Sequence, residues 1–125
     1  MAFNPQSILD SIKKLLGLEF DYTDFDDDVV MHVNTAFGIL QQLGVGPTTA
    51  YSITDNTQLW SDFSADISKL APVKTYIYQK VRLVFDPPGT SFGIIALEKV
   101  ITELETRLNM MGEALAPPSD PFANA

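Results

Sequence analysis

Apolar side chains recur at helical spacing in four long stretches of the chain, and the central stretch shows the strongest pattern. It begins at Pro72, which suits the first position of a helix because its missing N–H would have no partner there. It ends before D-P-P-G (86–89), which cannot continue a helix. Its apolar residues cover nearly the whole circumference: Val73, Tyr76, Ile77, Tyr78, Val81, Leu83, Val84 and Phe85. Because a helix that is apolar nearly all round is normally buried, the pattern predicts a central, buried helix over 72–85.

Two helices are predicted before this central one. Asn4 and Pro5 are typical of the N-cap and first residue of a helix, and the apolar face that follows them ends before Gly17. A second helix is predicted over 26–43, where a run of aspartates precedes the apolar face. The apolar positions of this second helix are Val29, Val30, Val33, Ala36, Phe37 and Leu40.

The last predicted helix is the longest. Thr90 or Ser91 is expected to cap its N-terminus, and Gly112 is expected to end it. Glu103 can pair with Arg107 one turn later on the exposed side. The apolar positions alternate at spacings of three and four, which is typical of the packing seam of a bundle helix. They are Ile94, Leu97, Ile101, Leu104, Leu108 and Met111.

The segment 45–56 has no helical period and is rich in turn formers and β-branched residues. We interpret it as one long loop that can hold a short β-hairpin, and long loops in compact domains are often functional. Thr57 then caps a short predicted helix over 58–65. Trp60, the only tryptophan, is expected in the core rather than on a ligand-binding surface.

Together these elements predict an all-α fold, a small bundle of four to five helices with one long loop. The helical domain is expected to occupy 1–112. The segment 113–125 contains Pro117, Pro118 and Pro121 and is predicted to form an extended C-terminal arm, either disordered or ordered by a partner. Phe122 favours the partner, because it is an apolar group on an otherwise solvated arm.

Composition excludes several classes of function. Among 125 residues, sixteen acidic and eight basic side chains give a formal charge of −8, which disfavours sequence-specific DNA binding because it repels phosphates. Cysteine is absent, which removes disulfides and thiolate metal sites. The chain lacks the pattern of a signal peptide and any apolar stretch of roughly 18 residues, so we expect a soluble protein without a membrane partner.

The acidic run over 19–28 shows part of the pattern of a calcium-binding loop. Asp24, Asp26 and Asp28 alternate as calcium ligands do, but a valine and a threonine occupy the positions that require glycine and glutamate. We therefore expect these carboxylates to cap the second helix and to complement its positive end. The alternative is an electrostatic role in contact with a partner.

No pattern of residues indicates catalysis. His32 is the only histidine, and no spacing singles out an acid–base pair of carboxylates. The segment G-V-G (44–46) lacks the third glycine and the context of a dinucleotide loop. We expect no catalytic residues, no cofactor and no metal site, and interpret the chain as an adaptor or interaction module rather than an enzyme.

Three blocks of sequence occur together in a characteristic order: D-D-D-V-V-M-H-V-N-T-A-F-G-I-L-Q-Q-L-G-V-G (26–46), V-K-T-Y-I-Y-Q-K-V-R-L-V-F-D-P-P (73–88) and L-E-K-V-I-T-E-L-E-T-R-L-N (97–109). In order and spacing they resemble the head-tail connector proteins of tailed bacteriophages, also called adaptor or head-completion proteins. These are small helical proteins that bind beneath the portal in the neck of the virion. The resemblance covers roughly 6–110, and the second and third blocks are its most specific part.

The resemblance implies a virion protein of the head-tail interface that is made in the host cytoplasm. It implies a homo-oligomeric ring, usually of about twelve copies, that docks beneath the portal protein and extends the DNA channel. Such a ring offers a platform to the stopper, tail or tail-completion protein, and genomic DNA passes through it without sequence-specific binding. The alternative is a cytoplasmic helical module for protein–protein interaction or regulation, which would have no reason to close into a ring.

The resemblance also implies two sets of contact residues. In related adaptors the C-terminal segment reaches the portal, which implies portal contacts at Leu108, Met111, Leu115, Pro117, Pro118 and Phe122. Loops at the opposite end meet the next neck protein, which implies contacts at Pro47, Tyr51, Ile53 and Asp55.

Overall fold

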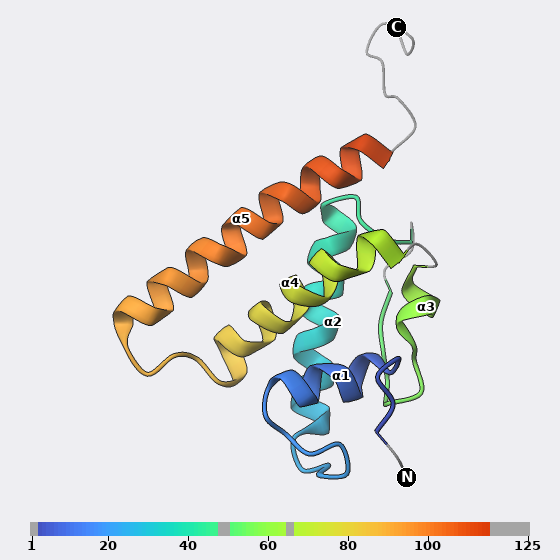
Figure 1. Cartoon of the computed structure of the whole chain (residues 1–125), viewed down its shortest axis with the longest axis vertical. Coiled ribbons are helices and arrows are strands. Elements are labelled where there is room, and N and C mark those ends of the chain that lie inside the picture. The colour runs from blue at the N-terminus through green and yellow to red at the C-terminus, as the bar shows by residue number, and fades with distance from the viewer. Residues whose placement is uncertain (1–2, 48–50, 65–66, 116–125) are drawn as a thin grey trace, which may run out of the picture.

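The chain folds into five α-helices, shown in Figure 1 for the computed structural model. They are α1 (Ile8–Leu15), α2 (Asp26–Gln42), α3 (Trp60–Phe63), α4 (Ile67–Phe85) and α5 (Ser91–Leu115). The structure describes residues 3–47, 51–64 and 67–115, and gives only the backbone of 67–69 and 112–115. Within these ranges there is no strand, only an isolated bridge between Ser7 and Leu59. The all-α prediction is confirmed, and the described parts of the 45–56 loop contain no hairpin.

Helix α4 lies at the centre of the bundle. It packs against α1, α2 and α5, and in Figure 1 it crosses α2 and runs antiparallel to α5. The predicted central helix is therefore confirmed. The side chains that α4 buries are Leu70, Val73, Tyr76, Ile77 and Val81.

The start of α4 differs from the prediction, because the helix begins at Ile67 and contains Pro72 in its interior. A proline there removes one backbone hydrogen bond and costs about 3 kcal/mol. Leu70 and Val73, on either side of it, are both buried in the core. Burial of each such side chain stabilises the fold by about 1.5 to 3 kcal/mol, which offsets the cost of the proline.

The end of α4 at Phe85 agrees with the prediction, but the expected burial of its last residues is wrong. Val84 is 57% exposed. Phe85 is only partly buried, and its ring lies edge-on to that of Phe25 with centroids 5.5 Å apart. The helix extends beyond the neighbours that cover its middle, so an apolar circumference does not ensure burial at this end.

Helix α1 begins later than Asn4 and Pro5 predict. Its N-cap is Ser7, whose Oγ accepts a hydrogen bond from the backbone N–H of Asp10 at 3.2 Å. Asn4 instead accepts from the backbone N–H of Gln6 in the preceding turn. Backbone hydrogen bonds to the segment before α3 (Ile8 N to Gln58 O and Trp60 N to Gln6 O) fix the chain on either side of Ser7. This long-range pairing decides where the helix starts.

The connection between α1 and α2 is held by a buried lysine. Lys13 is 1% exposed, and its Nζ donates to the backbone oxygens of Phe20 (3.0 Å) and Tyr22 (2.6 Å). The same Nζ lies 2.8 Å from Oδ1 of Asp26. The N-cap of α2 is Phe25, which makes no side-chain cap, so the predicted capping by aspartate is wrong. Acidic residues do occupy the first turn of α2, as expected for a helix N-terminus.

Helix α3 is shorter than predicted. Its N-cap is Leu59, whose backbone N–H donates to Oδ2 of Asp62 at 2.9 Å. Thr57 does not cap it, because its N–H and hydroxyl both donate to Asp55. Trp60 is in the core as predicted, 1% exposed, and its Nε1 donates to Oγ of Ser11 at 2.9 Å.

Helix α5 lies along α4 through the predicted seam, in which Leu97, Ile101 and Leu108 are buried and Leu104 and Met111 are partly buried. Thr90 caps its start, since its Oγ1 accepts from the backbone N–H of Gly93. The expected Glu103–Arg107 pair is present. The helix continues to Leu115, so the predicted end at Gly112 is wrong. A glycine inside a helix costs only about 1 kcal/mol, and 116–125 lie outside the described residues.

Candidate interaction surfaces

The N-terminal part of α5 carries apolar side chains on the face that points away from α4. Over 91–100 the sequence contains only one acidic and one basic residue, so this part is apolar nearly all round. Leu97 covers the inner side and is buried, whereas the opposite side leaves Phe92 (83%) and Ile95 (54%) exposed. We call these two residues the α5 outer face. These exposed apolar side chains make this face a candidate interaction surface.

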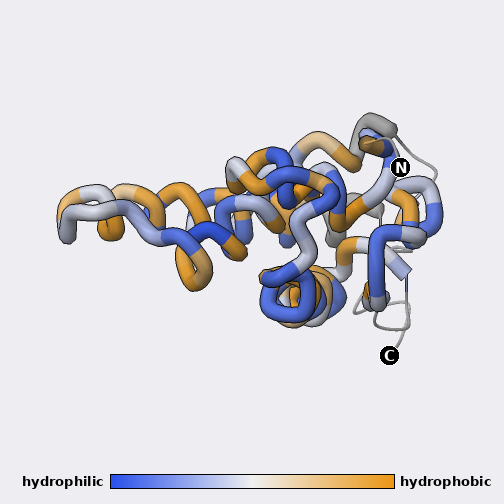
Figure 2. The backbone as a smooth tube through the Cα atoms, turned by 90° about the horizontal axis from the view of Figure 1, so that it is seen from below, coloured by the Kyte–Doolittle hydropathy of each residue, from blue (hydrophilic) through white to orange (hydrophobic). Residues whose placement is uncertain are grey.

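The α5 outer face lies at the end of the molecule where α4 turns into α5. Figures 1 and 2 show this end projecting away from α3 and the N-terminus. A shallow hollow of about 530 Å³ lies beside it, lined by Ile95, Glu98, Lys99, Thr102 and Glu103. A second hollow, of about 350 Å³, lies between α4 and α5 and is lined by Gln79, Arg82, Pro88, Gly93, Ala96, Leu97 and Val100. Both hollows join apolar surface to charged groups, a combination suited to contact with another protein.

The predicted portal-contact residues divide into two groups. Leu108 is 1% exposed and Met111 is partly buried, so both side chains pack inward and position α5. Leu115 is the last residue of α5, but its side chain lies outside the described residues, as do Pro117, Pro118 and Phe122.

Among the residues of α5 whose side chains the structure describes, Met110 is exposed near the C-terminal end, at 64%. The predicted seam could have indicated both Met110 and the α5 outer face as exposed. These side chains are apolar but do not belong to the seam, so α5 has no place for them against α4.

The predicted neck-partner residues lie on one loop but differ in exposure. Pro47 and Asp55 are exposed. Ile53 is buried, and its backbone N and O bond to the side-chain amide of Asn34 at 2.7 Å and 2.9 Å. Tyr51 is partly buried against the core, with its ring centroid 5.0 Å from that of Phe37. The buried pair therefore anchors the loop, and the exposed pair can meet a partner.

Two ionisable groups on this loop have shifted pKa values. Burial, followed by the nearby Asp62 carboxylate, raises the pKa of the Tyr51 hydroxyl. Hydrogen bonds from the side chain and backbone of Thr57 lower the pKa of the exposed Asp55 carboxyl. Asp55 thus presents a negative charge on the same loop as the uncharged Tyr51.

A partly buried hydrogen bond joins the two long helices. Tyr76 on α4 donates to Oε2 of Glu105 on α5 at 2.7 Å, and the Nζ of Lys80 lies 3.9 Å from the same oxygen. Burial first, and then the Glu105 carboxylate, raise the pKa of Tyr76. This contact fixes the register of α5 on α4 and so positions the α5 outer face.

In the part of the chain that the structure describes, histidines, aspartates and glutamates do not gather into a group of three or more that could hold a metal ion. His32 lies half-buried on α2. Across the same residues, the helices are too short or too polar to cross a membrane.

Comparison with known proteins gives one match. A family model described as phage connector protein matches residues 8–114, which include all five helices except the last residue of α5. No curated protein and no solved structure matches the chain.

Proposed function

The chain belongs to the phage connector protein family, and on that premise we propose that it forms a closed ring beneath the portal in the neck of the virion. The family is one of structural proteins, so the role of the chain is that of a structural connector and virion component. In the proposed ring the chain extends the DNA channel and offers a platform to the stopper or tail. About twelve copies would close the ring, as in related adaptors.

The α5 outer face supports the ring more than any other single observation. A ring uses two different patches of one surface, so that each copy contacts the next in the same way. The α5 outer face supplies an apolar patch at a projecting end of the molecule, where a neighbour can reach it. Water would otherwise cover Phe92, which is 83% exposed. A monomer gains no stability from a phenylalanine ring that is exposed to water.

The charge of the chain supports passage of DNA through the channel. A formal charge of −8 disfavours binding to the phosphate backbone. A channel formed by negatively charged subunits allows the DNA to slide through without being bound.

Phe92→Glu should prevent self-association while leaving the fold intact. The exposed ring contributes little to the stability of the monomer, but a charge in an apolar contact must lose its water, so we expect association to weaken by at least tenfold or about 1.4 kcal/mol. Thr106→Glu, at an exposed polar position further along α5, is the matched control. Mass by light scattering over a concentration series, alone and with the portal protein, measures the effect.

Electron microscopy of the same mixtures tests the ring itself. Closed rings on the portal would support the proposed function. A protein that stays monomeric at every concentration, with and without the portal, would contradict it and favour a cytoplasmic regulatory module.

We further propose that the C-terminal end binds the portal and that the 47–55 loop meets the stopper or tail-completion protein. Met110 is exposed, and the arm that follows α5 carries Pro117, Pro118 and Phe122. Leu108 and Met111 act in this proposal as inward-facing supports, and Leu115 leads into the arm. At the loop, Pro47 and Asp55 are the exposed contacts, while Tyr51 and Ile53 hold the loop in place.

A variant that ends at Leu115 should melt at the same temperature as the full chain, because it retains all the helices that the structure describes. It should no longer join portal-containing heads, since weak contacts from many copies in a ring add up to stable attachment and are lost together. Phe122→Ala should show a milder defect. Normal assembly of infectious particles by the shortened chain would exclude the arm as the portal anchor.

A further inference from the structure

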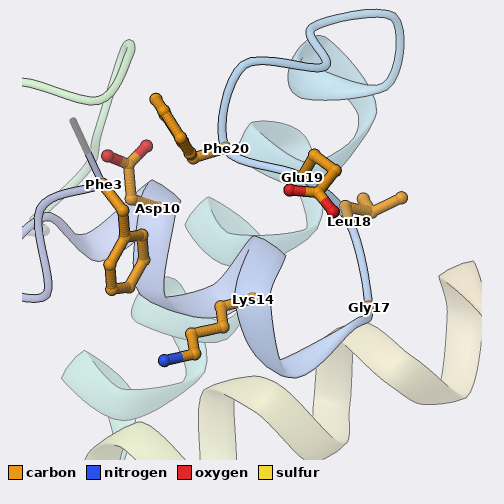
Figure 3. Close-up of a pocket in the computed structure, with 7 residues that line it drawn as sticks. All are labelled: Phe3, Asp10, Lys14, Gly17, Leu18, Glu19 and Phe20. Carbon is orange, nitrogen blue, oxygen red and sulfur yellow. The ribbon is translucent and has the colours of Figure 1, made fainter. Parts of the chain in front are cut away.

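The surface of α1 carries a pocket of about 420 Å³ that no part of the proposed function uses. Figure 3 shows its lining residues, and the pocket lies on the side of α1 that faces the 18–20 segment. We call it the α1 pocket. It is lined by Phe3, Asp10, Lys14, Gly17, Leu18, Glu19 and Phe20.

Asp10 is the unusual member of the α1 pocket. It is 2% exposed, and its Oδ1 is buried without a hydrogen-bond partner. Its Oδ2 accepts only one long hydrogen bond, from the backbone N–H of Asn4 at 3.4 Å. In Figure 3 the carboxylate points away from α1 beside Phe20, whereas the ring of Phe3 extends in the opposite direction, towards Lys14. A buried carboxylate is unfavourable unless a cation or a set of donors compensates it, so a cation or donor from outside the chain would stabilise this site.

The lining of the α1 pocket favours a guanidinium group. An arginine presents a planar donor fork to a carboxylate, and its delocalised charge is weakly hydrated and stacks on aromatic rings. Phe3 already receives a cation in this way, since the Nζ of Lys14 lies 4.9 Å from its ring centroid. Phe20 and Leu18 supply apolar walls for the aliphatic stem. The pocket thus suits an arginine side chain from another protein molecule.

A second copy of this chain can supply that arginine. Of its two arginines, Arg107 pairs with Glu103, whereas Arg82 has no ion-pair partner among the described residues. Arg82 lines the hollow between α4 and α5, next to Gln79, whose buried Oε1 also lacks a partner, and to the exposed Val100. An uncompensated carboxylate and an uncompensated guanidinium, each set in apolar surface, are complementary in charge and chemistry.

We propose that the α1 pocket of one copy binds Arg82 of a neighbouring copy, with the guanidinium on the Asp10 carboxylate. Because the contact joins two different surfaces of the chain, each copy can bind one neighbour through its α1 pocket and a second neighbour through its Arg82. This proposal rests on the ring of the proposed function and names one of its contacts.

Disulfide trapping tests the contact, because the chain contains no cysteine of its own. Glu19→Cys places a thiol at the exposed rim of the α1 pocket, and Ala96→Cys places one beside Arg82 in a mass-tagged second copy. We expect linked heterodimers to form at least tenfold faster with Ala96→Cys than with Thr106→Cys, an exposed control site further along α5. Equal rates at the two sites would overturn the proposed contact.

Asp10→Asn separates binding from folding. If Oδ1 lacks a partner within the chain, the neutral isostere should leave the melting temperature of the isolated protein unchanged or raise it. It should also slow trapping on the order of tenfold. Arg82→Gln should slow trapping by the same factor. The double variant should trap no more slowly than either single variant, because both substitutions remove the same contact. Asp27→Asn, an exposed first-turn aspartate of α2, is the matched control and should change neither quantity.

The outcomes distinguish this proposal from the proposed function. A lower melting temperature of Asp10→Asn would show that the carboxylate is satisfied within the chain, and would overturn the α1 pocket as a binding site. Rings of normal size formed by Asp10→Asn and Arg82→Gln would overturn the contact and leave the ring standing. Failure of the unaltered protein to associate, even with the portal, would overturn both.

Discussion

Lys13→Ala should lower the free energy of unfolding by about 3 to 5 kcal/mol, a large part of the roughly 5 to 15 kcal/mol that holds a domain together. The reason is the position of Lys13, which is 1% exposed, donates to two backbone oxygens and forms an ion pair with Asp26. Its removal leaves the backbone oxygens of Phe20 and Tyr22 without their donor and leaves Asp26 without its cation. Equilibrium unfolding in urea, followed by circular dichroism, measures the loss.

Two variants identify the cause of that loss. Lys13→Met keeps most of the side-chain volume and removes the charge, so a loss close to that of Lys13→Ala assigns the effect to the acceptors rather than to packing. Lys14→Ala alters the exposed neighbour and should change the free energy by no more than about 0.5 kcal/mol. A loss below about 1 kcal/mol for Lys13→Ala would mean that the connection between α1 and α2 does not depend on this lysine.

Trp60→Ala should be comparably destabilising, by about 3 to 5 kcal/mol. Trp60 is 1% exposed, its Nε1 donates to Ser11 on α1, and Lys74 on α4 lies 5.2 Å from its ring centroid. The side chain therefore joins α3 to two other helices, and its deletion leaves a large cavity. For a chain of this size the melting temperature should fall on the order of 10 to 20 °C in a calorimetric scan.

Trp60→Phe serves as the graded control. It retains a ring in the core and loses the hydrogen bond to Ser11, whose hydroxyl still donates to the backbone oxygen of Ile8. We expect a loss of about 1 to 2 kcal/mol. Equal losses for the alanine and phenylalanine variants would place the effect in the hydrogen bond rather than in the packing of the ring.

The predicted α2 and α5 agree with the structure because their apolar positions repeat over many turns. Val29, Val33 and Leu40 on α2, and Leu97 and Leu108 on α5, are buried as their spacing requires. A long repeat specifies one face of a helix whatever its neighbours are. For the same reason, the sequence predicted which side of α5 faces α4.

Helix starts were predicted less well, because several residues compete for each cap. Asn4 and Thr57 are good capping residues, yet Ser7 and Leu59 occupy the N-caps. The bridge between Ser7 and Leu59 pairs the two segments that precede α1 and α3, and this pairing leaves only one start for each helix. It spans about fifty residues of chain, so local sequence contains no sign of it.

The proposed contacts also required the tertiary structure. The resemblance implied portal contacts at Leu108 and Met111, which the seam itself turns inward. Phe92 and Ile95 were not singled out from the sequence, although both lie outside the predicted seam, because only the tertiary structure shows that they are left exposed. Asp10 belongs to a helix whose first turn commonly holds an acid, and only its burial and free oxygen distinguish it.

For this protein, the sequence by itself determined the helical class, the central position of α4, the seam of α5 and the resemblance to connectors. The first three follow from periodic spacing and from turn residues that act locally, and the resemblance rests on the three sequence blocks and their order. The tertiary structure decided the burial of Lys13 and Asp10 and the exposure of the α5 outer face. Burial depends on which neighbours cover a residue, and those neighbours come from distant parts of the chain.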